Sequence, residues 1–219
     1  RNCEVEMFIV EVKNATKKFK ETTALSDVTV SFEEGKIHGL IGRNGSGKTV
    51  LIKSICGLMH LTEGEILVRG QRVGKDIDVP PNIGIVIENP GFLPSYSGMK
   101  NLMYLAKIRN TVDRKQVAKS MEFVGLDPKS KKHVAKYSMG MRQRLAIAQA
   151  VMEDPDLLFL DEPMNGLDNQ GVKEIREAIQ TLKAQGKTIF LASHNAEDID
   201  ILCDTVHEMD AGVIRQFRP

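Results

Sequence analysis

Several features that define other classes of protein are missing from the sequence. No apolar run approaches the roughly 18 to 20 residues that a membrane-spanning helix needs, so we expect no transmembrane segment. Only three cysteines occur, at Cys3, Cys56 and Cys203, and without metal-type spacing they favour free thiols in a reducing compartment. The 30 Lys and Arg residues nearly balance the 29 Asp and Glu residues, which argues against binding nucleic acid by bulk charge. Charges also interrupt the apolar positions of the N-terminal segment, so no signal peptide is expected.

The 219 residues form the pattern of an α/β protein with a helical insertion. Strand-like segments open the chain at 5–12, 25–32, 37–41, 65–69 and 83–88. From about 97 to 153 the periodicity is helical, at 98–110, 113–124 and 138–153. Alternation then resumes with strands at 157–161 and 188–192, helices at 168–185 and 195–203, and a hairpin at 205–217. Buried strands that alternate with helices predict a mostly parallel sheet covered on both faces.

A glycine-rich loop follows the strand predicted at 37–41. Residues 42–49 read GRNGSGKT, which matches G-x-x-x-x-G-K-[ST] between a strand and a helix. Glycines let successive N–H groups converge on phosphate oxygens at the positive end of a helix. The alternative is a flexible glycine turn, which would not need to lie between a strand and a helix. We expect Lys48 to reach the β- and γ-phosphates and the Thr49 hydroxyl to help hold Mg²⁺. The predicted phosphate-binding residues are Gly42, Arg43, Asn44, Gly45, Ser46, Gly47, Lys48, Thr49 and Val50.

Two acids, Asp161 and Glu162, lie at the end of the apolar strand at 157–161 and directly after it. A buried strand ending in Asp161 delivers a carboxylate to the edge of the sheet where ligands bind in α/β folds. Alone, this pattern is that of an ordinary strand ending in a charged turn, but the phosphate loop favours a functional role. We predict that Asp161 assists Mg²⁺ and that Glu162 orients or deprotonates the attacking water.

Further motifs resemble those of ATP-binding cassette (ABC) proteins and follow in that family's order. They are the signature-like residues 137–144 (YSMGMRQR), the Walker B pair Asp161 and Glu162, the D-loop-like residues 165–168, His194 in the place of the switch histidine, and Glu88 in the place of the Q-loop glutamine. These motifs and the phosphate loop span nearly the whole chain, so the resemblance is specific.

The resemblance implies a fold and a division of the chain. The fold is that of a P-loop NTPase, with a mostly parallel sheet core, an N-terminal antiparallel β subdomain and an inserted α-helical subdomain. We expect a single ABC ATP-binding domain over 1–219. The ATPase core with the β subdomain takes 1–88 and 154–219, and the helical subdomain with the signature takes about 89–153.

The resemblance also implies roles for individual residues. Two copies would pair head to tail, so that Ser138 and Gly140 of one copy, together with Asp168, border the nucleotide on the phosphate loop of the other. Read alone, Ser138 is a plain helix cap. The catalytic residues would be Glu162, Lys48 and His194. Of these, His194 would contact the γ-phosphate, although a lone histidine after a strand is usually a surface or core residue.

Two further roles are implied at the edges of the site. Phe19 would stack on the adenine, whereas a phenylalanine beside strand segments is often simply core. Glu88 would join Thr49 and Asp161 around Mg²⁺, although its acid replaces the family's usual glutamine. The signature also departs from the common pattern, since Met139 and Met141 replace Gly and Gln. The combination of residues 87–90 (IENP) with residues 137–141 (YSMGM) resembles the ATPases of bacterial exporters of bacitracin-type and lantibiotic peptides.

The leading functional hypothesis is an ATPase, the motor subunit of an ABC transporter that couples Mg²⁺-dependent ATP hydrolysis to transport. The resemblance favours an exporter of antimicrobial peptide or drug in resistance or immunity. Its expected partners are a membrane-spanning subunit and a second copy or related ATPase, with no nucleic acid, and its expected location is cytoplasmic, peripheral on the inner face of the cell membrane. The alternatives are a soluble ABC ATPase not coupled to transport and a nucleotide switch that does not hydrolyse ATP, against which Glu162 argues.

Overall fold

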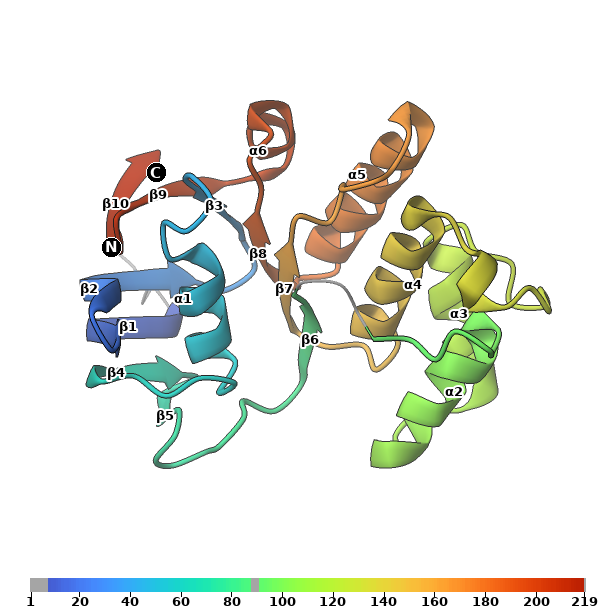
Figure 1. Ribbon diagram of the computed structural model, residues 1–219, viewed down its shortest axis with the longest axis horizontal. Coiled ribbons are helices and arrows are strands. Elements are labelled where there is room, and N and C mark those ends of the chain that lie inside the picture. Colours follow the sequence, from blue (N-terminus) through green and yellow to red (C-terminus); the bar gives the residue numbers. More distant parts are fainter. Residues whose placement is uncertain (1–7, 88–90, 219) are drawn as a thin grey trace, which may run out of the picture. The chain divides into compact units, whose positions relative to one another are not determined.

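The computed structural model describes residues 8–87 and 91–218, and they form two compact units (Figure 1). The first unit takes its described residues from 8–81 and 186–218. The second unit lies between these two segments in the sequence, at 82–185. Each unit has its own strands, helices and buried residues. Within 8–87 and 91–218, no helix combines the length and hydrophobic character that a bilayer span requires.

One sheet of the first unit is antiparallel and is built from the N-terminal part of the chain. Its strand order is β2-β1-β4-β5, with β1 at Phe8–Phe19, β2 at Thr22–Glu33, β4 at Glu63–Val68 and β5 at Gln71–Arg72. In β2 the side chains of Val28 and Phe32 are buried while those of Thr29 and Ser31 are exposed. This alternation places one face of the sheet against the core. Helix α1 (Lys48–Ile55) packs against β2 and β4 (Figure 1).

The first unit also contains parallel strands around β3 (Ile37–Ile41). Strand β8 (Thr188–Ala192) pairs in parallel on one side of β3, and β9 (Thr205–Asp210) pairs in parallel on the other. Strand β10 (Val213–Arg218) turns back antiparallel to β9. Every residue of β8 is buried, as expected for a strand covered on both faces. Helix α6 (Ala196–Leu202) connects β8 to β9.

The core of the first unit contains two histidines among aromatic rings. Phe32 contacts His38 and His207 edge to face, at ring-centroid distances of 5.1 and 4.9 Å. The imidazole of His38 is hydrogen-bonded through Nδ1 to the Thr205 hydroxyl and through Nε2 to the Glu33 carbonyl. Nδ1 of His207 is buried and makes no hydrogen bond within the described part of the chain. Burial lowers the pKa of His38 and lowers that of His207 to about 4, the latter helped by the nearby His38.

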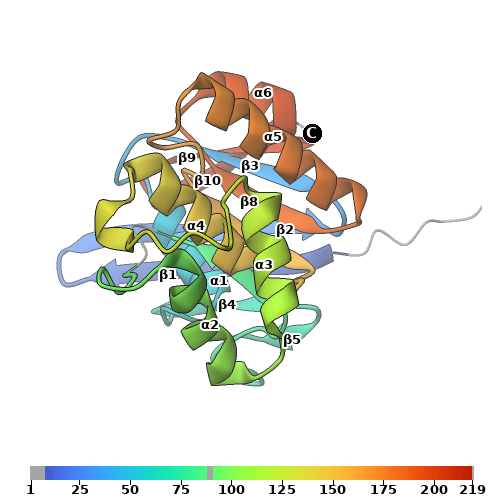
Figure 2. The ribbon, with the colours of Figure 1, turned by 90° about the vertical axis from the view of Figure 1, so that its right-hand side faces the viewer.

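The second unit combines two parallel strands with helices. Strand β6 (Ile83–Val86) pairs with β7 (Leu157–Asp161). The helices are α2 (Gly98–Arg109), α3 (Arg114–Phe123), the 3₁₀ turn η1 (Val134–Lys136), α4 (Met139–Val151) and α5 (Asn169–Ala184). Helix α3 packs against both α2 and α4 (Figure 2). Each α-helix of this unit has a capping side chain that accepts a hydrogen bond from the backbone N–H three residues on: Ser97, Asp113, Ser138 and Asp168.

The α/β fold predicted from the sequence is confirmed, and β7 and β8 have their predicted bounds. The N-terminal strands are longer than the predicted 5–12 and 25–32. Register shifts interrupt the pairing of β1 with β2. Asn14, just beyond the predicted end at residue 12, adopts a left-handed conformation, which breaks the alternation that marks a strand. The predicted strands 5–12 and 83–88 each extend beyond the described residues at one end.

The second unit is larger than the helical subdomain expected at about 89–153. It includes β6, β7 and α5 together with the predicted helices. This unit is defined by contacts between residues, whereas the expected subdomain was defined by helical periodicity. The predicted boundaries at 88 and 154 therefore stay a prediction.

We predict that acid destabilises the protein through the buried His207. Because its pKa of about 4 lies below the ordinary 6.5, the unfolded chain binds a proton first as the pH falls. The stability due to neutral His207 is full above pH 6.5 and is lost progressively between 6.5 and 4. His207 should account for a loss of about 2 kcal/mol in the free energy of unfolding between pH 7 and 5. Urea titrations at both pH values measure it.

The matched comparison for this prediction uses two leucine substitutions. In His207→Leu, the free energy of unfolding should differ less between pH 7 and pH 5, by about 2 kcal/mol, because the titrating group is removed. His133→Leu, at an exposed position, should keep the wild-type difference. An unchanged pH dependence in His207→Leu would contradict the assignment of this effect to His207.

Candidate functional site

The loop between β3 and α1 has a backbone that requires glycine at specific positions. Gly42 and Gly47 have φ angles of +143° and +113°, which side chains rarely permit. A Cβ on Gly42 would collide with the carbonyl oxygen of Met209, and one on Gly47 would lie 2.6 Å from that of Ala24. The backbone N–H of Gly212, in the β9–β10 turn, donates to the Ser46 carbonyl at 2.9 Å. The loop is thus shaped by its glycines and supported by the β9–β10 hairpin.

Two polar side chains of this loop are buried. The ammonium of Lys48 donates to the carbonyl oxygens of Gly42 at 2.7 Å and Arg43 at 3.1 Å, so it is held within the curve of the loop. The Ser46 hydroxyl is buried and makes no hydrogen bond within residues 8–87 and 91–218. Helix α1 has no acid in its first turn, so its positive end is not neutralised locally. A buried donor and a buried cation at a helix N-terminus suit an anion such as phosphate.

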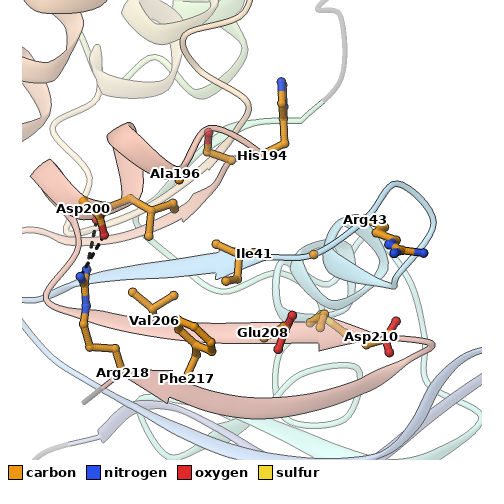
Figure 3. A pocket seen from close by; sticks show the side chains of 14 residues that line it. Ile41, Arg43, His194, Ala196, Asp200, Val206, Glu208, Asp210, Phe217 and Arg218 are labelled. Carbon is orange, nitrogen blue, oxygen red and sulfur yellow. Dashed lines mark hydrogen bonds and ion pairs between the residues drawn. The ribbon is translucent and has the colours of Figure 1, made fainter.

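The predicted switch residue His194 lies at the same edge of the first unit as the phosphate loop. Because β3 and β8 are parallel neighbours, the segments that leave their carboxyl ends are adjacent. The Ser193 N–H lies 3.4 Å from the Leu40 carbonyl oxygen, and the Ser193 hydroxyl accepts the N–H of Asn195. The loops that carry Arg43 and His194 border a single cavity of about 780 Å³ (Figure 3). The structure therefore brings these two predicted residues to one place.

The cavity is also bordered by residues that the sequence analysis did not select. Its apolar lining includes Val206 on β9 and Phe217 on β10, and its rim carries an ion pair between Asp200 and Arg218, 3.1 Å apart (Figure 3). Glu208 adds a further acid. The hairpin at 205–217 is predicted by the sequence, but its place at this cavity is not. The hairpin reaches the cavity because β9 pairs in parallel with β3, a strand far away in the sequence.

Phe19 lies at the end of β1 and is not a core residue. Its side chain is 43% exposed, and the ammonium of Lys17 stands 5.1 Å from the centre of its ring. The core interpretation of this phenylalanine is therefore wrong. Its stacking on a base stays a prediction.

In the second unit, the Walker B acids lie at the carboxyl end of β7. Asp161 is the last residue of the strand, and Glu162 adopts a left-handed backbone conformation with φ of +51°. The carbonyl oxygen of Glu162 accepts a hydrogen bond from the Asn165 N–H at 3.1 Å and one from Nε2 of Gln143 at 3.3 Å. A non-glycine residue in this conformation costs on the order of 1–3 kcal/mol and persists only where its surroundings hold it.

The signature residues have structural roles within their own chain. Ser138 is the N-cap of α4, and its exposed hydroxyl accepts the N–H of Met141 at 3.2 Å. A Cβ on Gly140 would lie 2.9 Å from the carbonyl oxygen of Gly166, so this close approach requires glycine. Asp168 caps α5 in the same way as Ser138 caps α4. These contacts explain the residue types, and the predicted contacts to nucleotide stay predictions.

The predicted site residues are divided between the two units. The phosphate loop, Phe19 and His194 belong to the first unit, and the Walker B, signature and D-loop residues belong to the second. Glu88 lies outside the described residues. Within the described ranges, no group of three or more His, Cys, Asp and Glu side chains is placed to hold a metal ion.

Comparison with known proteins identifies the family. The model of the ABC transporter family matches residues 25–165. The chain belongs to the ABC transporter family. It is an ATPase of that family, as the sequence motifs predicted.

The relatives of this ABC protein include transport ATP-binding proteins. It is 44% identical to the uncharacterised ABC transporter ATP-binding protein YybJ of Bacillus subtilis, over 93% of this chain and 94% of the relative. It is 40% identical to the bacitracin transport ATP-binding protein BcrA of Enterococcus faecalis, over 94% of this chain and 67% of the relative. It is 34% identical to the lantibiotic transport ATP-binding protein SrtF of Streptococcus pyogenes, over 90% of this chain and 85% of the relative.

A solved structure supports the same fold. The ABC protein superposes on the cassette MJ0796, in a dimeric post-hydrolysis state bound to ADP and phosphate, with a TM-score of 0.85 and 23% identity. The match covers 95% of this chain and 98% of that one. The predicted P-loop NTPase fold is confirmed.

We predict that Lys48→Ala weakens ATP binding at least tenfold. The substitution removes the buried cation of the phosphate loop, and hydrogen bonds to charged groups contribute about 1.5–3 kcal/mol each. Isothermal titration calorimetry with ATP measures the effect. Lys115→Ala, at an exposed position on α3, is the control and should bind ATP as the wild type does. Unchanged affinity in Lys48→Ala would overturn the role of the loop.

Proposed function

We propose that the chain is the ATP-binding and ATP-hydrolysing motor subunit of a bacterial exporter of antimicrobial peptides or drugs, serving resistance or immunity. The observation that carries this proposal is the 40% identity to a bacitracin transport ATP-binding protein, which extends over 94% of the chain. The 34% identity to a lantibiotic transport ATP-binding protein points to the same class of cargo.

In the proposed reaction, the chain's own residues bind ATP and move one proton. The ammonium of Lys48, now on loop carbonyls, turns to the β- and γ-phosphates, and the N–H groups at the start of α1 hold phosphate oxygens. The carboxylate of Glu162 takes a proton from the attacking water. His194, on the cavity that Arg43 also borders, contacts the γ-phosphate. Phe19, exposed at the end of β1, stacks on the adenine.

Mg²⁺ fits the oxygen donors that the chain offers. The Thr49 hydroxyl and the Asp161 carboxylate are hard ligands, and Mg²⁺ in proteins usually binds one or two such groups together with substrate phosphates. The ion would neutralise charge on the phosphates, and Glu88 is the third proposed ligand.

The signature residues are proposed to act on a second copy of the chain or a related ATPase. Ser138 is exposed at the N-terminus of α4, whose first turn contains no acid, so this helix end suits a phosphate. Gly140 and Asp168 would lie beside it in a head-to-tail dimer closed by ATP. A membrane-spanning subunit would convert the opening and closing into transport, with this chain peripheral on the cytoplasmic face.

We predict that Glu162→Gln binds ATP but hydrolyses it at least about a hundredfold more slowly, because general base catalysis contributes roughly 10²–10⁴ in rate. Its turnover is measured by phosphate release, and the trapped ATP-bound dimer by size-exclusion chromatography. Glu177→Gln, at an exposed position on α5, is the control with a wild-type rate. Hydrolysis by Glu162→Gln at the wild-type rate would show that Glu162 is not the base.

The proposed role in transport is tested by identifying the proteins that co-purify with this chain from its own cells. The full chain, isolated from membranes in mild detergent, should carry a multi-helix membrane protein identified by mass spectrometry. Deleting its gene should increase sensitivity to bacitracin-type or lantibiotic peptides. A ribosomal or other soluble partner, with unchanged sensitivity, would instead support an ABC ATPase that is not coupled to transport.

A further inference from the structure

The loop that follows Asp161 is held by the signature helix of the same unit. Nε2 of Gln143, on α4, donates to the Glu162 carbonyl oxygen at 3.3 Å. The hydrogen bond from the Asn165 N–H to the same oxygen is local and closes the turn itself. Gln143 therefore supplies a bond that ties the turn to another element of the fold.

The same end of α4 also contacts the far end of this loop. A Cβ on Gly140 would lie 2.9 Å from the Gly166 carbonyl oxygen, and a Cβ on Gly166 would collide with the side chain of Met139. Residues three and four apart lie on one face of a helix, so Gln143 continues the surface that begins with Met139 and Gly140. One face of α4 thus contacts both ends of the segment 162–166.

The conformation of Glu162 explains why such support is needed. With φ of +51°, the residue has a backbone that a side-chain-bearing residue adopts at a cost, and the direction of its side chain depends on that backbone. A shift of about 1 Å at a catalytic group is enough to lower a rate substantially. Gln143 is partly buried and belongs to the regular helix α4, which positions its amide beside the turn.

We propose that Gln143 is a positioning residue for catalysis: its amide holds the backbone of Glu162 so that the carboxylate meets the attacking water. This rests on the proposed role of Glu162 as the base. It follows that α4 serves two sites. Its N-terminus would meet the ATP held by the other copy, while Gln143 holds the base for the ATP of its own copy.

The test replaces Gln143 by methionine, which has a similar length and no N–H donor. Gln143→Met should lower kcat for ATP hydrolysis about tenfold and leave KM for ATP and ATP-dependent dimerisation unchanged, because the phosphate loop and the Ser138 cap are untouched. Gln143→Lys keeps a donor at slightly longer reach and should recover most of the lost rate. Gln180→Met, at an exposed position on α5, is the matched control and should behave as the wild type.

A merely structural role gives a different result. If Gln143 only stabilises the fold, Gln143→Met lowers the melting temperature, and the kcat of the folded protein at low temperature equals that of the wild type. That result would overturn the proposal. Loss of rate in Gln143→Lys equal to that in Gln143→Met would also overturn it, since the donor would then not matter.

A double-mutant cycle tests whether Gln143 acts through Glu162. In single-turnover hydrolysis, Gln143→Met should cost about tenfold in the wild type and nothing further in Glu162→Gln. A tenfold loss in both backgrounds would overturn the proposal while leaving Glu162 as the base. A wild-type rate in Glu162→Gln alone would overturn the base assignment, and with it this proposal, so the two failures are distinguished by the single variant.

Discussion

The parallel pairing of β3 with β8 and β9 is the constraint on which the first unit depends. It brings the carboxyl ends of strands from distant parts of the sequence to one edge, where Gly42 follows β3 and Ser193 follows β8. The β9–β10 turn then supports the phosphate loop through Gly212. Because the loop approaches the Met209 backbone closely, only glycine fits at position 42. The loop's shape is thus a tertiary property as well as a local one.

A comparable constraint acts in the second unit on a smaller scale. Asp161 ends β7, and the turn that follows begins at Glu162, which has a left-handed backbone. The first turns of α4 contact this segment through Met139, Gly140 and Gln143. The signature residues therefore have a place in the packing of their own unit. Their identity follows from that packing together with any contact they make to nucleotide.

Many of the strands could be predicted from the sequence. The buried strands at 157–161 and 188–192 are short apolar runs with clear ends, and they were predicted at their observed bounds. The first long strand was predicted to end too early, because the irregularity near Asn14 breaks the period-two pattern just beyond residue 12. Phe19 shows the limit of residue type, since its exposure depends on where β1 ends.

The phosphate loop and the acids at the end of β7 can be identified from the sequence, because each is a short motif of neighbouring residues. Membership of the ABC family follows from the order of several such motifs along the chain. The groups that contact the phosphate loop and the acids at the end of β7 from elsewhere in the fold are seen only in the tertiary structure. Gln143 reaches the Glu162 carbonyl, and the β9–β10 hairpin reaches the phosphate loop, through contacts between segments far apart in sequence. Local patterns encode a residue's own conformation, whereas its neighbours across the fold depend on strand pairing and helix packing.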